Sequence, residues 1–300
     1  AEDGTYKVDQ LTEENAVAAV IDNSSNVTYY GTLTGAAKNV GAGETVKLLK
    51  DCTSAYPVKV NNAAYGMTLD LNGHNITNTN TASTAKALDL GFGGQNTYAP
   101  VKITNSGDAT ATISAATPVV ATASQGEMEV VIGENVTLNS TVDQRQMKLE
   151  GSAYVDVSGK TDAEIEALGD LWKTTDNKLF GDLSYAARFA NGDVTLVKDY
   201  TGSSGLTARN TCVVDFNGHT YNVQSNADYV LDIDNGNVSV ALKNGTLTSS
   251  TEHTGIITNG TDSDINLTLQ NFNLSVPNGR GIYFPSSGSV TIENSVINAK

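Results

Sequence analysis

The sequence predicts an all-β solenoid made of two tandem modules, and three observations lead to this fold class. A strand-and-turn pattern recurs at intervals of 26, 27 and 23 residues in the second half of the chain. A longer block of motifs returns about 145 to 150 residues after its first occurrence. Charged residues make up only 17% of the chain and there are five prolines, so the composition favours strands and turns over helices. Repeats of this period without helices between them are typical of stacked coils.

The repeated pattern is clearest in residues 69–77 and again in residues 214–222. Leu69 and Leu71 alternate with polar residues, which is the period of a strand with one buried face. A turn residue follows, and Ile76 then returns an apolar side chain to the core. The same order of positions occurs without the histidine in residues 240–248, 267–275 and 290–298.

The turn position of the pattern is occupied by Gly or Asn in every copy. These two residues adopt a positive φ most readily, so we expect a left-handed turn at each position. Stacked asparagine side chains could also form hydrogen bonds from coil to coil. The predicted turn and ladder residues are Gly73, Asn105, Gly218, Asn244, Asn271 and Asn294.

Three motifs in the same order indicate that the chain is a tandem duplication. A Gly-x-Leu-x-x-Ala motif begins at Gly31 and returns 150 residues later. A Leu-x-Lys-Asp motif returns after 148 residues and an Asn-Gly-His motif after 145 residues. Small deletions in loops explain the decreasing offset.

Short elements are expected around the start of each module. Residues 20–30 read as a hairpin around a polar turn, although residues 12–20 could also begin a helix. A capping box at Thr161 opens a helix that extends through Leu171. Asp182 is the expected N-cap of a short helix ending near residues 191–192. A helix at this place would cover the exposed strand edges of the first coil.

The duplication divides the chain into three predicted parts. They are a first module with its N-terminal hairpin at residues 1–158, a helical linker at residues 159–179 and a second module at residues 180–300. Further strands on a second side of the solenoid are expected at residues 87–90, 229–233, 255–257 and 281–284. The sequence stops at Lys300 directly after a coil strand, so we expect the natural chain to continue or another subunit to cover this end. Self-association through this coil is therefore one predicted interaction.

Charge and cysteine content restrict the classes of partner. The net charge of −15 argues against nucleic acid and anionic membranes as partners. The sequence contains no run of about 18 apolar residues that could span a bilayer. Residues 1–3 look like a mature end after removal of a signal peptide, which predicts a secreted or cell-surface protein. Cys52 and Cys212 occupy different places in the repeat, which argues against a disulfide between them.

The three duplicated motifs resemble those of the β-helix modules in secreted surface proteins of anaerobic bacteria. These modules belong to the pectate-lyase-like superfamily of right-handed parallel β-helices. The resemblance covers residues 17–158 and 172–300 and implies a right-handed parallel β-helix in an extracellular location. It leaves function open, because such modules occur in adhesins, wall-anchored proteins and carbohydrate-active enzymes.

The resemblance also raises the question of catalysis. A polysaccharide lyase on this fold would need acidic calcium ligands beside a basic residue, and none of the four arginines follows an acidic cluster in the repeat. A hydrolase would need paired carboxylates on adjacent coils. Asp232 and Asp234 are interpreted as solvated, and Asp262 with Asp264 is a candidate calcium site in a turn. No catalytic residue is assigned.

Two further sets of residues are candidates for a functional or a structural role. His74 and His219 hold the same place in both repeats, which favours a structural role with a repeated hydrogen bond. Exposed tyrosines could stack on sugar rings and so bind carbohydrate without catalysis. The candidate binding residues are Tyr29, Tyr30, Tyr56, Tyr65 and Tyr98.

Three functions follow from these observations. The first is a non-catalytic cell-surface or extracellular protein that mediates adhesion or binds glycans, with a glycan or a host or cell-surface protein as partner. The second is a structural subunit that assembles into a surface layer or fibre. The third is a polysaccharide lyase or glycoside hydrolase. The first function is favoured, because no residues typical of a catalytic site cluster in the repeat.

Overall fold

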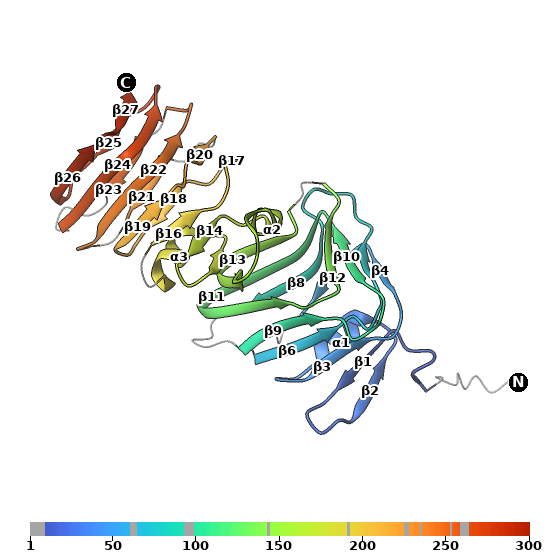
Figure 1. The fold of residues 1–300 in the computed structure, drawn as a ribbon. Helices are drawn as coiled ribbons and strands as arrows, with labels where there is room; N and C mark the ends of the chain where they lie inside the picture. The colour runs from blue at the N-terminus through green and yellow to red at the C-terminus, as the bar shows by residue number, and fades with distance from the viewer. Residues whose placement is uncertain are drawn as a thin grey trace, which may run out of the picture. The chain divides into compact units, whose positions relative to one another are not determined.

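The computed structural model (Figure 1) describes residues 10–60, 65–92, 99–142, 145–190, 193–224, 228–234, 236–252, 254–258 and 264–300. The chain is mostly β, with 54% of residues in strands and 8% in three short helices across the described ranges. The strands form a β-solenoid of about 9 turns. The predicted fold class is therefore confirmed.

The chain divides into two compact units, Ala1–Lys148 and Leu149–Lys300. The division lies earlier in the chain than the predicted one at residue 158, and residues 159–179, predicted as a helical linker, fall within the second unit. Strand β13 (Met147–Asp156) pairs with strand β15 (Lys178–Phe180), which lies beyond these residues. The second unit therefore includes its own N-terminal cap.

The first unit contains one helix and twelve complete strands within the residues described. Its elements are β1 (Ala18–Ile21), β2 (Val27–Tyr30), α1 (Leu33–Asn39), β3 (Thr45–Leu48), β4 (Cys52–Ser54), β5 (Val58–Lys59), β6 (Tyr65–Asp70), β7 (Ile76–Asn78), β8 (Lys86–Phe92), β9 (Ala99–Thr104), β10 (Ala111–Ala115), β11 (Thr117–Ile132) and β12 (Val136–Ser140).

Parallel pairing in the first unit forms three sides of a coil. One side stacks β3, β6, β9 and the end of β11. A second side stacks β5, β8 and the start of β11. The third side is a four-stranded sheet in the order β12, β10, β7 and β4. The predicted strand at residues 87–90 is thus confirmed as part of β8 on the second side.

After β13, the described part of the second unit contains two helices and fourteen strands. Its elements are α2 (Asp162–Leu168), β14 (Trp172–Thr174), β15, α3 (Leu183–Phe189), β16 (Val194–Leu196), β17 (Tyr200–Gly202), β18 (Leu206–Ala208), β19 (Cys212–Asp215), β20 (Thr220–Val223), β21 (Tyr229–Ile233), β22 (Ser239–Thr248), β23 (Thr254–Thr258), β24 (Asp264–Val276), β25 (Ile282–Tyr283), β26 (Ser287–Glu293) and β27 (Val296–Ala299).

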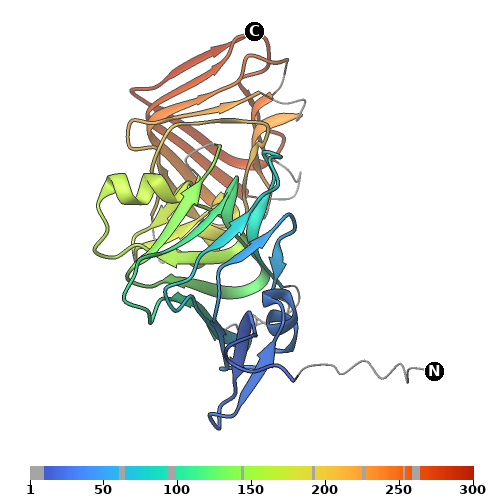
Figure 2. The ribbon, with the colours of Figure 1, turned by 90° about the vertical axis from the view of Figure 1, so that its right-hand side faces the viewer.

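Three stacks of parallel strands form the sides of the second unit (Figure 2). The first stack runs through β16, β19, β22, β24 and β26. The second is a sheet of β18, β21, β23 and β25, which confirms the expected second side. The third contains β17, β20, β27 and the C-terminal halves of β22 and β24. These two long strands thus contribute to two sides.

The core of the second unit consists of apolar rows that run from coil to coil. Val214, Leu242 and Leu269 are register partners in the first stack, and each is fully buried at 0% exposure. Phe216 and Phe272 pack edge to face with their ring centroids 4.8 Å apart. Burial of a side chain of this kind contributes about 1.5–3 kcal/mol, so these rows hold successive coils together.

Each unit begins with a cap of the same construction. An antiparallel hairpin is followed by a short helix and by a strand that pairs antiparallel with the first strand of the hairpin. In the first unit Ala18 pairs with both Tyr30 and Leu48. In the second unit Trp172 takes the place of Ala18 and pairs with Phe180 and Leu196. The hairpin expected at residues 20–30 is confirmed, and the duplication extends to a second hairpin formed by β14 and β15.

The capping signals around the helices are also confirmed. Thr161 and Glu164 form the capping box of α2, with the Thr161 N–H donating to the Glu164 carboxylate at 2.8 Å. Helix α2 ends earlier than expected because Gly169 adopts a left-handed C-cap at φ 98°. Asp182 is the N-cap of α3 and accepts from Ser184 N at 2.8 Å.

The last coil described, β26 and β27, is exposed along its length. Ile292 is 49% exposed and Ile297 is 36% exposed, whereas their register partners one coil earlier, Leu269 and Leu274, are buried. Among the helices of the described residues, none has the length and apolar character needed to cross a membrane.

Candidate binding cleft

The repeated turns adopt the left-handed backbone at most of the expected positions. Gly73 and Gly218 have φ values of 80° and 85°. Asn244, Asn271 and Asn294 have φ values of 57°, 49° and 46°. The alternation of Gly and Asn therefore reflects the low cost of this conformation for both residues.

Asn105 differs from this set, because its backbone does not have a positive φ. Its side chain instead bridges three coils. The Asn105 Oδ1 accepts from Gly73 N at 2.7 Å, and Nδ2 donates to Asn135 O at 3.1 Å. Asn135, in the following coil, has a φ of 57°. Asn105 is thus a ladder residue without being a left-handed turn residue.

A second side-chain ladder follows the turns of the second unit. Asn271 Nδ2 lies 3.5 Å from Asn244 Oδ1, and Asn244 Nδ2 donates to Asp215 Oδ1 at 3.2 Å. Asp215 Oδ1 in turn accepts from Asn217 N at 2.8 Å. These bonds join three successive coils on their polar outer edge.

The duplicated histidines make the same contact in both units. His74 Nδ1 lies 3.5 Å from Asp51 Oδ1, and His219 Nδ1 lies 3.3 Å from Asp199 Oδ1. In each case the same carboxylate oxygen accepts from the next backbone N–H after the histidine at 2.8 Å. The Lys-Asp and Asn-Gly-His motifs are therefore two parts of one turn contact, which accounts for their joint duplication.

The asparagine before each turn glycine differs between the two units. Asn72 and Asn217 have nearly the same backbone, with φ values of 49° and 51°. The Asn72 Nδ2 donates to Leu48 O at 2.9 Å, which ties the side chain to the previous coil. Within the described residues, the side-chain amide of Asn217 has no hydrogen bond. It lines a cleft of the second unit instead.

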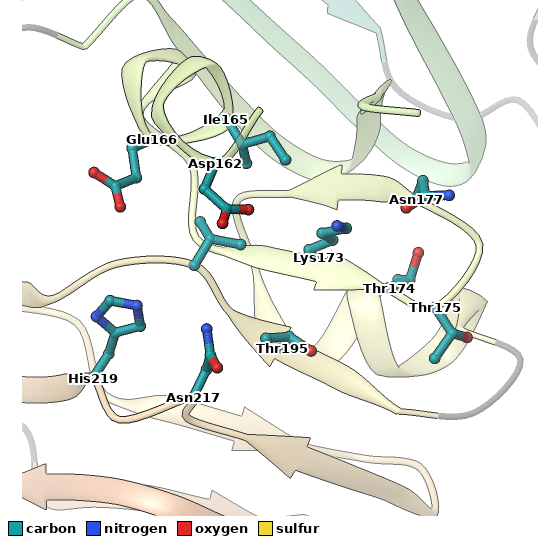
Figure 3. A pocket seen from close by; sticks show the side chains of 11 residues that line it. Asp162, Ile165, Glu166, Lys173, Thr174, Thr175, Asn177, Thr195, Asn217 and His219 are labelled. Carbon is teal, nitrogen blue, oxygen red and sulfur yellow. The ribbon is translucent and has the colours of Figure 1, made fainter. Parts of the chain in front are cut away.

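This cleft has a volume of about 330 Å³ and lies wholly within the second unit (Figure 3). Helix α2 forms one wall, strands β14 and β16 form the floor, and the turn after β19 forms the opposite wall. The lining residues are Asp162, Ile165, Glu166, Lys173, Thr174, Thr175, Asn177, Thr195, Val197, Asn217 and His219.

Most groups in the cleft can form hydrogen bonds. Asp162 and Glu166 are exposed and one helical turn apart on α2, and Lys173 is half-buried on β14 (Figure 3). In the described part of the chain, these three side chains form no hydrogen bond or ion pair. Ile165 is 2% exposed and anchors α2 to the core. Lys198 Nζ donates to Glu166 O at 3.3 Å and so connects the helix to the segment after β16.

Helix α2 has no counterpart in the first unit among the described residues. The first unit has a turn at the corresponding place, where Ala16 N donates to Thr12 O at 2.9 Å, just as Ile165 N donates to Thr161 O at 3.0 Å. Val17 and Leu171 then accept equivalent bonds from the strand ends after β3 and β16. Thr12 lies five positions before Val17, whereas Thr161 lies ten before Leu171. The additional residues form α2.

Three of the five tyrosines expected to bind sugars have described side chains, and they lie on two segments of the first unit. Tyr29 and Tyr30 are half-buried neighbours on β2, and successive strand residues face opposite sides. Tyr56 is 80% exposed in the connection between β4 and β5. Tyr65 lies in β6, where its side chain is outside the description, and Tyr98 is outside the described residues.

The acidic candidates behave differently from one another. Asp264 begins β24 and is exposed, and its backbone N–H donates to Asn237 Oδ1 at 3.2 Å. Asp262 lies outside the described residues, so the proposed calcium pair stays a prediction. Across the described ranges, no group of three or more His, Cys, Asp or Glu side chains could hold a metal ion. Asp232, expected to be solvated, is only 5% exposed because β21 is covered on both faces.

The sequence interpretation did not identify the cleft residues of α2 and β14. The signal was present in the capping box and in the five additional residues before β14, but residues 159–179 were assigned to a linker. The sequence of the chain matches no known family model, no curated protein and no solved structure. The relation to the pectate-lyase-like superfamily therefore stays a prediction.

Proposed function

We propose that this chain is a non-catalytic extracellular or cell-surface protein that binds glycans, and that the cleft beside α2 is its binding site. The supporting observation is the divergence of the duplicated turn. In the first unit the Asn72 amide donates to Leu48 O, whereas the Asn217 amide lines the cleft and has no hydrogen bond among the described residues. A residue released from a structural bond into a polar cleft is available to a ligand.

The size and chemistry of the cleft suit a sugar. Binding pockets for small molecules have volumes of about 300–1,000 Å³, and this cleft of about 330 Å³ would hold one or two sugar rings. Carboxylate, amide, hydroxyl and imidazole groups from four segments converge on it. Such groups recognise hydroxyls by hydrogen bonds in fixed directions.

The placement of the two carboxylates favours binding over hydrolysis. Glycosidases place two carboxyl groups on either side of the scissile bond. Asp162 and Glu166 both project from α2, so they approach a ligand from the same wall of the cleft. A sugar in the cleft would therefore meet acceptors without an acid and a base flanking its glycosidic bond.

The test is a glycan-array screen of residues 1–300, followed by calorimetry with the glycans that bind. We expect binding without product formation, with and without calcium. Asn217→Gly should weaken binding because it removes the amide, and it keeps the left-handed backbone at φ 51°. The matched variant Asn72→Gly should keep binding and lose stability, because it breaks the bond to Leu48 O.

Turnover of polygalacturonate, alginate or another glycan that is abolished by changing one acidic residue would replace this proposal with the lyase or hydrolase alternative. Assembly into a surface layer or fibre is the other alternative, and the exposed apolar side chains of β26 and β27 favour it. Particle imaging of residues 1–300 that shows ordered polymers would support it.

A further inference from the structure

The cleft presents more hydrogen-bond acceptors than donors. The carboxylates of Asp162 and Glu166 can only accept, and neither has a partner among the described residues. Lys173 is the one lining side chain that carries a fixed positive charge. The Thr175 and Thr195 hydroxyls and the Asn177 and Asn217 amides can serve in either role, whereas the Thr174 hydroxyl already donates to Asp176. A complementary ligand therefore has to be rich in donors.

The contact of His219 with Asp199 adds a further acceptor. His219 Nδ1 lies 3.3 Å from Asp199 Oδ1, and a carboxylate oxygen accepts hydrogen bonds. When the ring is neutral, this contact places the proton on Nδ1 and leaves Nε2 with a lone pair. Because His219 lines the cleft, this lone pair is a third acceptor that a ligand can use.

The charge of the cleft also favours a ligand that donates hydrogen bonds. Two carboxylates face one lysine in the cleft, and the whole chain carries a net charge of −15. This negative charge would repel an anionic sugar and attract a cationic sugar. A charge-assisted hydrogen bond to a carboxylate is also stronger than a neutral one.

From these observations we infer that the cleft binds an amino sugar whose amine is protonated, with the ammonium between Asp162 and Glu166 and the ring hydroxyls toward His219 and Asn217. This inference rests on the proposed glycan-binding function and names the ligand class of the same site. The ammonium supplies three N–H donors to the acceptor-rich wall formed by α2. The hydroxyls then use the acceptors and the amide on the opposite wall.

The experiment measures binding of four soluble probes to residues 1–300 by calorimetry: glucosamine, N-acetylglucosamine, glucose and glucuronate. Glucosamine should bind most tightly, and its affinity should fall when the pH is raised above the pKa of its amine. The double variant Asp162→Asn, Glu166→Gln should weaken glucosamine binding by about tenfold or more, because it removes the charge from two acceptors. Glu252→Gln, which changes an exposed carboxylate outside the cleft, should leave the affinity unchanged.

Lys173→Met tests the sign of the charge effect. Removal of this ammonium should strengthen glucosamine binding if the ligand is cationic, and weaken binding if the ligand is anionic. Thermal unfolding of each variant identifies any loss of affinity that comes from misfolding, and Lys173→Met tests the inference even where the double variant fails to fold.

The outcomes separate this inference from the proposed function. Equal binding of glucosamine and glucose, or tighter binding of glucuronate, would overturn the amino-sugar inference and leave glycan binding in place. Glucosamine binding that the cleft variants do not alter would overturn the assignment to the cleft. If neither these probes nor any array glycan binds, the proposed function itself is wrong.

Discussion

The turns of this protein show how one backbone conformation selects the residue. Asn244 and Asn271 have φ values of 57° and 49°, a region that is costly for most residues with a Cβ atom. Asn is tolerated there because its short polar side chain forms local or inter-coil hydrogen bonds, as Asn244 does with Asp215 at 3.2 Å. Backbone and ladder therefore select the same residue type.

Substitution of Asn271 separates these two contributions. Asn271→Val should destabilise the second unit by about 1–2 kcal/mol through the backbone alone. Asn271→Gly should cost far less, because glycine adopts the positive φ freely and the bond to Asn244 is long at 3.5 Å. Urea unfolding of both variants measures the difference. Equal destabilisation would mean that the side chain matters more than the backbone.

The two cysteines are free and should differ in reactivity. Burial, with a smaller contribution from Asp193, raises the pKa of Cys212 from 9.0 to about 11. Burial also raises the pKa of Cys52, which is the more exposed of the two. Because the thiolate is the reactive form, alkylation below pH 9.0 should label Cys52 first and Cys212 slowly.

Mass spectrometry of the labelled peptides measures the two rates. Both cysteines should react alike in guanidinium chloride, where burial is lost. Raising the pH toward the pKa of Cys212 should speed its labelling in the folded chain. Equal rates in the native protein at lower pH would contradict the burial of Cys212.

At the scale of elements, the duplicated caps use the same parts in different surroundings. Each cap combines a hairpin, a helix of seven residues and a strand that pairs with the hairpin. The glycine before each helix is also duplicated, as Gly31 and Gly181. A Cβ atom on Gly31 would meet nothing within 4 Å, whereas one on Gly181 would overlap the carbonyl oxygen of Leu149.

The two glycines therefore provide a matched pair of variants. Gly181→Ala should destabilise the second unit by about 1–3 kcal/mol, because the contact is with backbone that cannot move aside easily. Gly31→Ala should be close to neutral. Thermal unfolding of both variants tests this, and a larger effect at Gly31 would mean that the caps pack differently from the structure.

At the scale of the whole molecule, the chain consists of two units that each contain a cap and a solenoid. The second unit begins at Leu149, and its first residues form contacts that a later start would remove. Leu149 N donates to the buried Asp170 carboxylate at 3.0 Å, and Tyr154 pairs with Phe180 in the cap. The end of β13 is therefore part of the second fold.

Truncation tests this boundary. Residues 149–300 should unfold cooperatively when expressed alone. Residues 172–300 should have a lower unfolding midpoint, because they lack β13, α2 and Asp170 and leave Phe180 partly uncovered. Circular dichroism during heating compares the two fragments. An equal midpoint for both would show that residues 149–171 do not stabilise the second unit.

Much of this fold could be predicted from local spacing. The alternation around Leu69 and Leu71 and the regular return of Gly or Asn predict strands and turns, because stacked strands repeat the same short-range pattern. The register is not fully predicted in this way: residues 214–222 and 240–248 share the pattern, but Val214 pairs with Leu242 and not with Val240. The capping box at Thr161 and the N-cap at Asp182 are also local signals. Asp182 lies two positions from its partner Ser184, so no tertiary information was needed.

The candidate site, in contrast, depends on contacts between distant parts of the chain. His219 meets Asp199 only because a complete coil closes between them, and α2 faces Asn217 only because β14 folds back against β16. The sequence predicts a helix through Leu171, whereas the structure ends α2 at Leu168 and begins a capping strand at Trp172. The sequence by itself determined the solenoid and its duplication, since these follow from residue spacing along the chain. Tertiary structure decided the unit boundary and the cleft, because both depend on which coils and caps pack together in space.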